Sequence, residues 1–190
     1  GGYVAKAVPG NAGLNAAAML KDPRQAYVVL GAEPELDCAN GAEALASLTK
    51  AAAVVVLSSF KSQAMLDYAA VLLPVSPFSE TSGTFVNTEG RAQSFYAAAK
   101  PLGETRPAWK VLRVLGNLLA LNGFEFNSSE DVRAEVLGGN PEFVSGLDNG
   151  IDAPALHLAA GGNGIERVAD VPIHFADPLV RRSAALQQAA

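Results

Sequence analysis

The chain has 190 residues, a formal net charge of -5 and a pI near 5.0, and 49% of its residues are hydrophobic. This length suits one large domain, and the composition excludes general disorder. An acidic balance argues against nucleic-acid binding, and apolar runs well short of about 20 residues predict no direct membrane insertion.

The N-terminal part begins Gly1-Gly2-Tyr3 without an initiator Met, which we interpret as a piece of a longer protein. Gly10, Asn11 and Gly13 then precede an alanine-rich stretch that runs to Leu20. Glycine and asparagine favour turns and alanine favours helix, so we expect a loop that enters a helix.

Three short apolar runs follow, at residues 26–30, 53–57 and 71–73. Continuous apolar runs of this length are typical of strands buried on both faces of a parallel sheet. Helical segments separate the runs, so the pattern predicts a parallel βαβαβ unit with right-handed crossovers. The expected fold class is α/β, with a Rossmann-like parallel-sheet core.

The connections between these runs differ in character. Residues 32–41 are expected to lack regular structure, because Pro34 and Asp37 disfavour it. Residues 42–50 predict a helix, and Ser58-Ser59 is expected to cap a second helix that ends near Leu66.

Two more helices are predicted after the third strand. One follows Arg106-Pro107 and ends near Asn122-Gly123; its apolar face is formed by Trp109, Leu112, Leu115 and Leu119. The other is capped by Ser128 and stopped by Gly138-Gly139.

From residue 140 onward, frequent glycine and proline indicate a loop-rich segment whose last residues, 187–190, are frayed. We therefore expect an α/β domain over residues 1–123 and a helix plus loop-rich segment over residues 124–190.

The most distinctive polar segment follows the third strand, at residues 78–93. Open α/β sheets usually bind ligands at the carboxyl ends of their strands, so this loop is a candidate site. However, Gly83, Asn87 and Gly90 also suit a loop that bonds to itself, with Glu89 and Arg91 forming internal ion pairs. The second interpretation is favoured, because local turn chemistry is commoner than a binding site.

This segment resembles the molybdopterin oxidoreductase family, whose members carry a strand ending in proline, then a glutamate and a glycine-threonine-phenylalanine-asparagine-glutamate-glycine-arginine-glutamine loop. One departure is Ala70, where the family usually has aspartate. The matching positions are Glu80, Gly83, Thr84, Phe85, Asn87, Glu89, Gly90, Arg91 and Gln93.

Residues 75–84 and 176–187 are more similar to one branch of this family, the large iron–sulfur subunit of NADH-quinone oxidoreductase, respiratory complex I. The second of these segments places the chain near the C-terminus of that subunit.

The resemblance implies a catalytically silent scaffold and docking region in the peripheral arm of complex I, supporting electron transfer from NADH to quinone. Its partners would be other peripheral-arm subunits, on the cytoplasmic side of the bacterial inner membrane. No catalytic, cofactor-binding or metal residue is expected in this chain, and the matching loop residues are structural or vestigial. Iron–sulfur clusters are expected elsewhere in the full-length subunit.

Two other hypotheses stay open. The chain could be the cofactor-contacting domain of an active molybdopterin oxidoreductase resembling formate dehydrogenase, with residues 80–93 near the pterin. A free-standing nucleotide-binding domain is disfavoured, because neither Gly10-Asn11-Ala12-Gly13 nor Gly161-Gly162-Asn163-Gly164 has the spacing of a phosphate-binding motif.

Other reactive residues give weak signals. Cys38 is the only cysteine, so the chain cannot by itself ligate an iron–sulfur cluster or form an internal disulfide. His157 and His174 lack the spacing of a metal site. Arg181-Arg182 could pair with an acidic partner, although a solvated surface pair is at least as plausible.

Overall fold

The computed structural model describes residues 1–2, 4–138 and 172–189. They belong to two compact units, Gly1–Gly146 and Leu147–Ala190, which are described separately. The expected boundary after residue 123, between an α/β domain and a C-terminal segment, stays a prediction. In the part of the chain that the structure describes, no helix has the length and apolarity needed to span a membrane.

The first unit is built on a parallel sheet of strands β1 (Ala26–Leu30), β2 (Ala53–Ser58) and β3 (Val71–Pro74), in the order β1-β2-β3. In the register, Val29 lies beside Val56, and Val56 beside Leu72. The three apolar runs thus form the predicted parallel strands, and the α/β fold class is confirmed.

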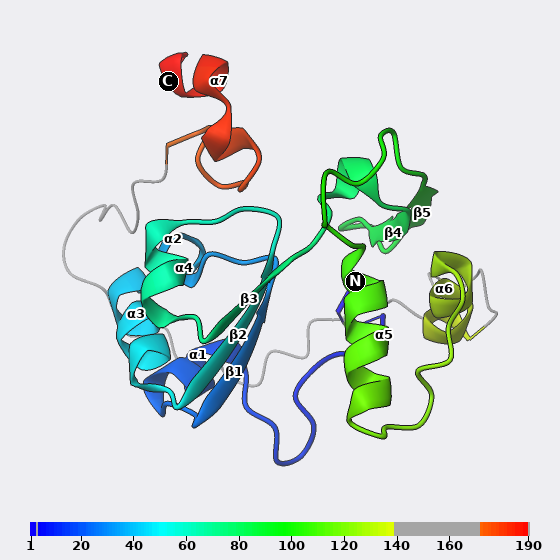
Figure 1. Ribbon diagram of the computed structural model, residues 1–190, viewed down its shortest axis with the longest axis horizontal. Helices are drawn as coiled ribbons and strands as arrows, with labels where there is room; N and C mark the ends of the chain where they lie inside the picture. The colour runs from blue at the N-terminus through cyan, green and yellow to red at the C-terminus, as the bar shows by residue number, and fades with distance from the viewer. Residues whose placement is uncertain (3, 139–171, 190) are drawn as a thin grey trace. The chain divides into compact units, whose positions relative to one another are not determined.

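Helices α1 (Ala16–Lys21), α3 (Gly41–Lys50) and α4 (Gln63–Tyr68) lie on one side of this sheet (Figure 1). The hydrophobic core is between them and the sheet. Its buried members are Leu48, Val54, Val56, Met65 and Tyr68.

The other face of the sheet is exposed at the two outer strands, although Leu57 of β2 is 0% exposed there, and this corrects the expectation that all three strands are buried on both faces. Val28 and Leu30 of β1 are 59% and 46% exposed, and Val71 of β3 is 45% exposed. Because side chains alternate along a strand, these residues point away from the face that α1, α3 and α4 cover.

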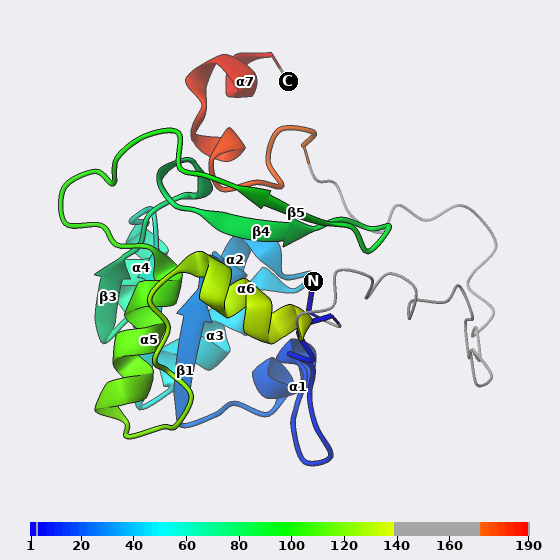
Figure 2. The ribbon, with the colours of Figure 1, turned by 90° about the vertical axis from the view of Figure 1, so that its right-hand side faces the viewer.

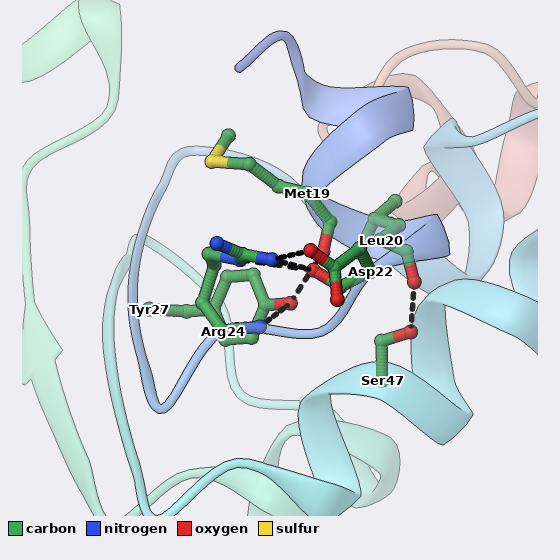
Figure 3. Close-up of polar contacts among 6 residues, drawn as sticks. All are labelled: Met19, Leu20, Asp22, Arg24, Tyr27 and Ser47. Carbon is green, nitrogen blue, oxygen red and sulfur yellow. Dashed lines mark hydrogen bonds and ion pairs between the residues drawn. The ribbon is translucent and has the colours of Figure 1, made fainter. Parts of the chain in front are cut away.

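Polar contacts attach α1 to both of its neighbours (Figure 3). The Tyr27 hydroxyl of β1 donates a hydrogen bond to the Met19 carbonyl at 2.7 Å. The Ser47 hydroxyl of α3 donates to the Leu20 carbonyl. An ion pair between Arg24 and Asp22 completes the turn that leads from α1 to β1.

Two connections differ from the sequence prediction. Residues 32–41, which were expected to lack regular structure, contain a one-turn helix, α2 (Pro34–Asp37). Proline suits the first position of a helix, because its fixed backbone angle is helical and it has no N–H group that needs an acceptor. The cap of α4 is Ser62, whose hydroxyl accepts the Met65 N–H, rather than Ser58-Ser59.

After β3 the chain forms a short 3-10 helix, η1 (Phe78–Glu80), and an antiparallel hairpin of β4 (Gly83–Val86) and β5 (Ala92–Phe95). This hairpin was not predicted. Helix α5 (Ala108–Leu118) follows, and Figure 2 shows it beside α6 (Ser129–Leu137).

Helix α5 ends earlier than predicted, because the chain leaves the helical conformation at Ala120, which has a φ of +54°. The prediction for α6 is confirmed. Ser128 and Asp131 form a capping box, and Gly138 stops the helix with a φ of +59°.

In the second unit the structure describes η3 (Val180–Arg182) and α7 (Ala184–Gln188). Gln187 is not frayed, since its amide donates to the carbonyls of His174 and Val180. Arg181 is not a solvated surface residue. It is 9% exposed, and its guanidinium donates to the Phe175 carbonyl at 3.1 Å.

The loop-rich segment expected from residue 140, with His157 and Gly161-Gly162-Asn163-Gly164, lies outside the described residues.

Candidate functional site

The loops at the carboxyl ends of the strands gather acidic and hydroxyl side chains. Glu33, which follows β1 after Gly31, is only 2% exposed, and Ser58 at the end of β2 is 8% exposed. Gly31 has a φ of +62°, a conformation that favours glycine and turns the chain away from the sheet. This edge is where a parallel sheet usually presents ligand-binding groups.

Glu35 connects this edge to α4. Its carboxylate accepts hydrogen bonds from Ser62 and from the Tyr68 hydroxyl, both at the long distance of 3.5 Å. The Asp37 carboxylate accepts the Glu33 N–H at 2.7 Å. We call Glu33, Glu35, Asp37 and Tyr68 the strand-end cluster.

Two groups in or beside this cluster have raised pKa values and therefore stay protonated. Burial, and then the nearby Glu35 carboxylate, raise the pKa of the Tyr68 hydroxyl, so it stays a donor at neutral pH. Burial, then Asp37 and Glu35, raise the pKa of the Cys38 thiol. Because the thiolate is the reactive form, Cys38 is poorly suited to act as a nucleophile or a metal ligand.

The donor set of the strand-end cluster does not fit a metal or a phosphate. Among the described residues, no group of three or more His, Cys, Asp or Glu could hold a metal ion. Three carboxyl groups close to the strand ends would repel a phosphate, which is normally bound by backbone N–H groups and cations. No chemical step is therefore assigned to a cofactor at this edge.

The nine residues of the family motif all lie between η1 and the end of β5. Glu80 ends η1, and its carboxylate accepts the Leu102 N–H at 2.9 Å. This hydrogen bond holds the segment before β4 against the segment that follows β5. We call residues 80–93 the family loop.

Asn87 organises the turn between β4 and β5. Its side-chain oxygen accepts the Arg91 N–H at 2.8 Å, and its own N–H donates to the Arg91 carbonyl at 3.1 Å. Gly90 has a φ of +79°, which explains the glycine there. The asparagine and glycine of the family motif are thus used inside the turn.

The expected ion pair between Glu89 and Arg91 is not formed in this structure. Glu89 instead lies 3.5 Å from the Asn87 side-chain amide, which donates to it. The side chains of Glu89, Arg91 and Gln93 are exposed. They are among the family-loop groups that another molecule could reach.

Aromatic contacts stabilise the face of the hairpin. Phe85 stacks on Phe95 with ring centroids 4.7 Å apart, and Phe78 meets Phe85 edge-on at 6.4 Å. A Cβ at Gly83 would lie 2.9 Å from the Phe95 ring, so this glycine makes room for the ring. Phe85 is nevertheless 59% exposed.

The sequence indicated the family loop and the sheet edge, but not the strand-end cluster. Glu35 and Tyr68 are 33 positions apart and meet only through the packing of α2 and α4. The signal that could have found them was a run of acidic residues directly after a buried strand. Among the weaker candidates, Cys38 lies beside this cluster, whereas His174 lies in the second unit.

Known proteins resemble much of this chain. Residues 1–118 match the molybdopterin oxidoreductase family. "Putative formate dehydrogenase SAB2186c" of Staphylococcus aureus (strain bovine RF122 / ET3-1) is 50% identical over 60 residues, which are 32% of this chain and 6% of that protein. "Putative formate dehydrogenase SAUSA300_2258" of S. aureus (strain USA300) is 48% identical over 60 residues, with the same coverage of each chain. The match thus spans only 6% of the length of these relatives.

Proposed function

This chain belongs to the molybdopterin oxidoreductase family, and we propose that it forms a supporting α/β domain of a large redox enzyme resembling formate dehydrogenase. The observation that carries the proposal is the stretch of 60 residues that is 50% identical to the protein named "Putative formate dehydrogenase SAB2186c". The matched part of that relative is small, so the activity of the whole enzyme is part of the proposal.

Within such an enzyme, this domain would act through shape rather than through bond-making groups. Its strand-end cluster fits neither a metal nor a phosphate, and Cys38 is held as a thiol. The exposed Glu89, Arg91 and Gln93 of the family loop would contact the cofactor-bearing part of the enzyme.

The test uses the full-length protein that contains this chain. We expect molybdenum or tungsten in about one-to-one ratio with protein by mass spectrometry of the metals, and formate-dependent reduction of a viologen dye. Absence of both metals from protein purified after growth with molybdate and tungstate would overturn the formate dehydrogenase proposal.

A paired substitution examines the supporting role. Glu80→Gln keeps an acceptor for the Leu102 N–H, whereas Glu80→Ala removes it. We expect both variants to retain the metal, with only Glu80→Ala losing thermal stability. Loss of metal from Glu80→Gln would mean that the carboxylate itself serves the cofactor.

The second candidate is the C-terminal region of the large iron–sulfur subunit of NADH-quinone oxidoreductase, a region without a cofactor of its own. One observation supports it: Glu80 and Asn87 use their side-chain acceptors inside the chain, as expected of a loop that holds no cofactor. The chain would then be a docking region among peripheral-arm subunits, at the cytoplasmic side of the bacterial inner membrane.

The same preparation distinguishes the two candidates. The complex I candidate expects iron without molybdenum, tungsten or pterin, and co-purification with NADH-dependent quinone reduction. Stoichiometric pterin would contradict it.

A further inference from the structure

A groove runs along α5. It has a volume of about 540 Å³, and its walls include Leu73 of β3, Trp109 of α5 and Phe126 of the following loop. Helix α5 has 11 residues, which at 1.5 Å per residue gives a surface of about 16 Å in length. We call this feature the α5 groove.

The rim of the α5 groove is positively charged. Arg106, Lys110 and Arg113 line it, and residues 105–124 contain no acidic residue, although the whole chain has a net charge of -5. Like charges at these spacings repel one another, and the first turn of a helix disfavours cations. Within the helix, only the Trp109 ring offsets this arrangement among the described residues, since the Lys110 Nζ lies over it at 5.4 Å from the centroid.

These cations have few acceptors. Arg106 meets Glu104 at 3.8 Å, but both side chains are well exposed, so this pair contributes little. The Nε of Arg113 is buried and has no hydrogen-bond acceptor among the described residues. A buried donor without a partner is costly, and it leaves the Arg113 guanidinium incompletely paired among the described residues.

Apolar side chains line the groove and continue beyond it. Val114 and Leu118 of α5 line it and are 50% and 79% exposed. Leu119 and Leu121, which follow the helix and do not line the groove, are 61% and 51% exposed. An apolar stripe flanked by one sign of charge matches the surface of an amphipathic helix of opposite charge. The exposed stripe extends past the cavity, which favours an elongated segment over a compact small molecule.

We infer that the α5 groove docks an acidic amphipathic helix from a separate protein subunit. The apolar side chains of that helix would cover Val114 and Leu118, and its carboxylates would pair with Arg106, Lys110 and Arg113. This inference does not depend on which redox enzyme contains the chain.

The chain has a built-in reporter, because Trp109 is its only tryptophan and lines the groove. The probe is a synthetic helical peptide with leucines at positions i, i+3, i+4 and i+7 and glutamates on both flanks. Titration into the 190-residue chain should give a saturable shift of Trp109 fluorescence. The affinity should fall as salt rises, because the screening length drops from about 30 Å at 0.01 M to about 3 Å at 1 M.

Two variants test the charges. Lys110→Glu should weaken peptide binding by about fivefold or more, since it replaces an attraction with a repulsion. Lys100→Glu is the matched control, because it makes the same charge change at an exposed residue of the same unit outside the groove. It should bind the peptide within about twofold of the parent chain. Circular dichroism melts verify that both variants fold.

Several outcomes would overturn the inference. A peptide in which lysines replace the glutamates should not bind, and equal binding would exclude charge recognition. No saturable shift with the acidic peptide would exclude docking. Concentration-dependent self-association of the chain that excludes the peptide would identify a second copy as the occupant, and tighter binding of dodecanoate would identify a small amphiphile.

Discussion

The parallel sheet and the β4–β5 hairpin lie in the same unit but are stabilised differently. The sheet is covered by helices on one face, where Val54, Val56 and Met65 are at most 1% exposed. In the hairpin, Gly90 is the only buried residue between positions 83 and 95. Its order comes from the Asn87 turn, the Glu80 carboxylate and the stacked Phe85 and Phe95.

The two regions therefore obtain their stability from different interactions. The sheet depends on apolar area removed from water by segments distant in sequence, so it should unfold with the whole unit. The hairpin depends on local hydrogen bonds and one aromatic cluster, so it can adjust without disturbing the core. A loop stabilised in this way suits contact with another part of a larger enzyme.

The largest expected effect comes from adjacent residues of α4. Met65→Ala should lower the free energy of unfolding by about 2–5 kcal/mol, because Met65 is fully buried and its removal leaves a cavity. Leu66→Ala is the control, since Leu66 is 48% exposed on the same helix, and it should cost less than about 1 kcal/mol. Urea denaturation measures both. Equal costs would mean that the core is not where the structure places it.

A second test concerns the close approach of α2 and α3. A Cβ at Gly41 would lie 2.1 Å from the Glu35 carbonyl oxygen, so Gly41→Ala should destabilise the unit by about 1–3 kcal/mol. At Gly10 no atom lies within 4 Å of such a Cβ, and Gly10→Ala should be nearly neutral. Thermal melts compare the two variants, and a neutral Gly41→Ala would contradict the packing of the strand-end cluster.

A smaller effect is expected in the hairpin. Phe85→Leu removes the ring stack on Phe95 and should cost about 0.5–1.5 kcal/mol. Tyr96→Leu, at a residue that is 79% exposed, is the matched aromatic control. Amide hydrogen exchange should show faster exchange in β4 and β5 while the sheet is unchanged. Faster exchange in the sheet as well would break the distinction between the two regions.

The smallest effect is a pH dependence of α6. Hydrogen bonds from the Asn127 and Ser128 N–H groups and from the Ser128 side chain lower the pKa of Asp131 below its usual 3.8. A carboxyl group whose pKa is lowered in the folded state stabilises the helix at pH values above its unfolded-state pKa. This stabilisation is lost as the pH falls through the folded-state pKa. Carboxyl NMR shifts should therefore give a midpoint below 3.8. A midpoint at or above the usual value would mean that the capping box does not form in solution.

How far the sequence predicts this structure depends on the range of the forces involved. The apolar runs predicted β1, β2 and β3 nearly to the residue, because burial of continuous apolar strands leaves a strong local pattern. The cap at Ser128 could also be predicted, because the residues of a capping box lie within four consecutive positions of the sequence.

The failures involve choices that are made elsewhere in the chain. Whether Val28 is buried depends on which helices cover its face of the sheet, and an apolar run alone does not predict that. Glu35 and Tyr68 meet because α2 forms one helical turn, which the proline was expected to prevent. The family motif predicted a polar loop, but the pairing of β4 with β5 depends on cross-strand contacts such as Phe85 with Phe95.

The apolar residues exposed on the second face of the sheet have a practical consequence for handling this chain. Val28, Leu30 and Val71 form an apolar face beside a strand edge, and such surfaces promote association between molecules. Sulfate and phosphate strengthen apolar association, so crystallisation or storage in these salts should favour precipitation of the chain. A Val28→Thr substitution would make this face more polar without touching the covered core, and it offers a more soluble protein for solution measurements.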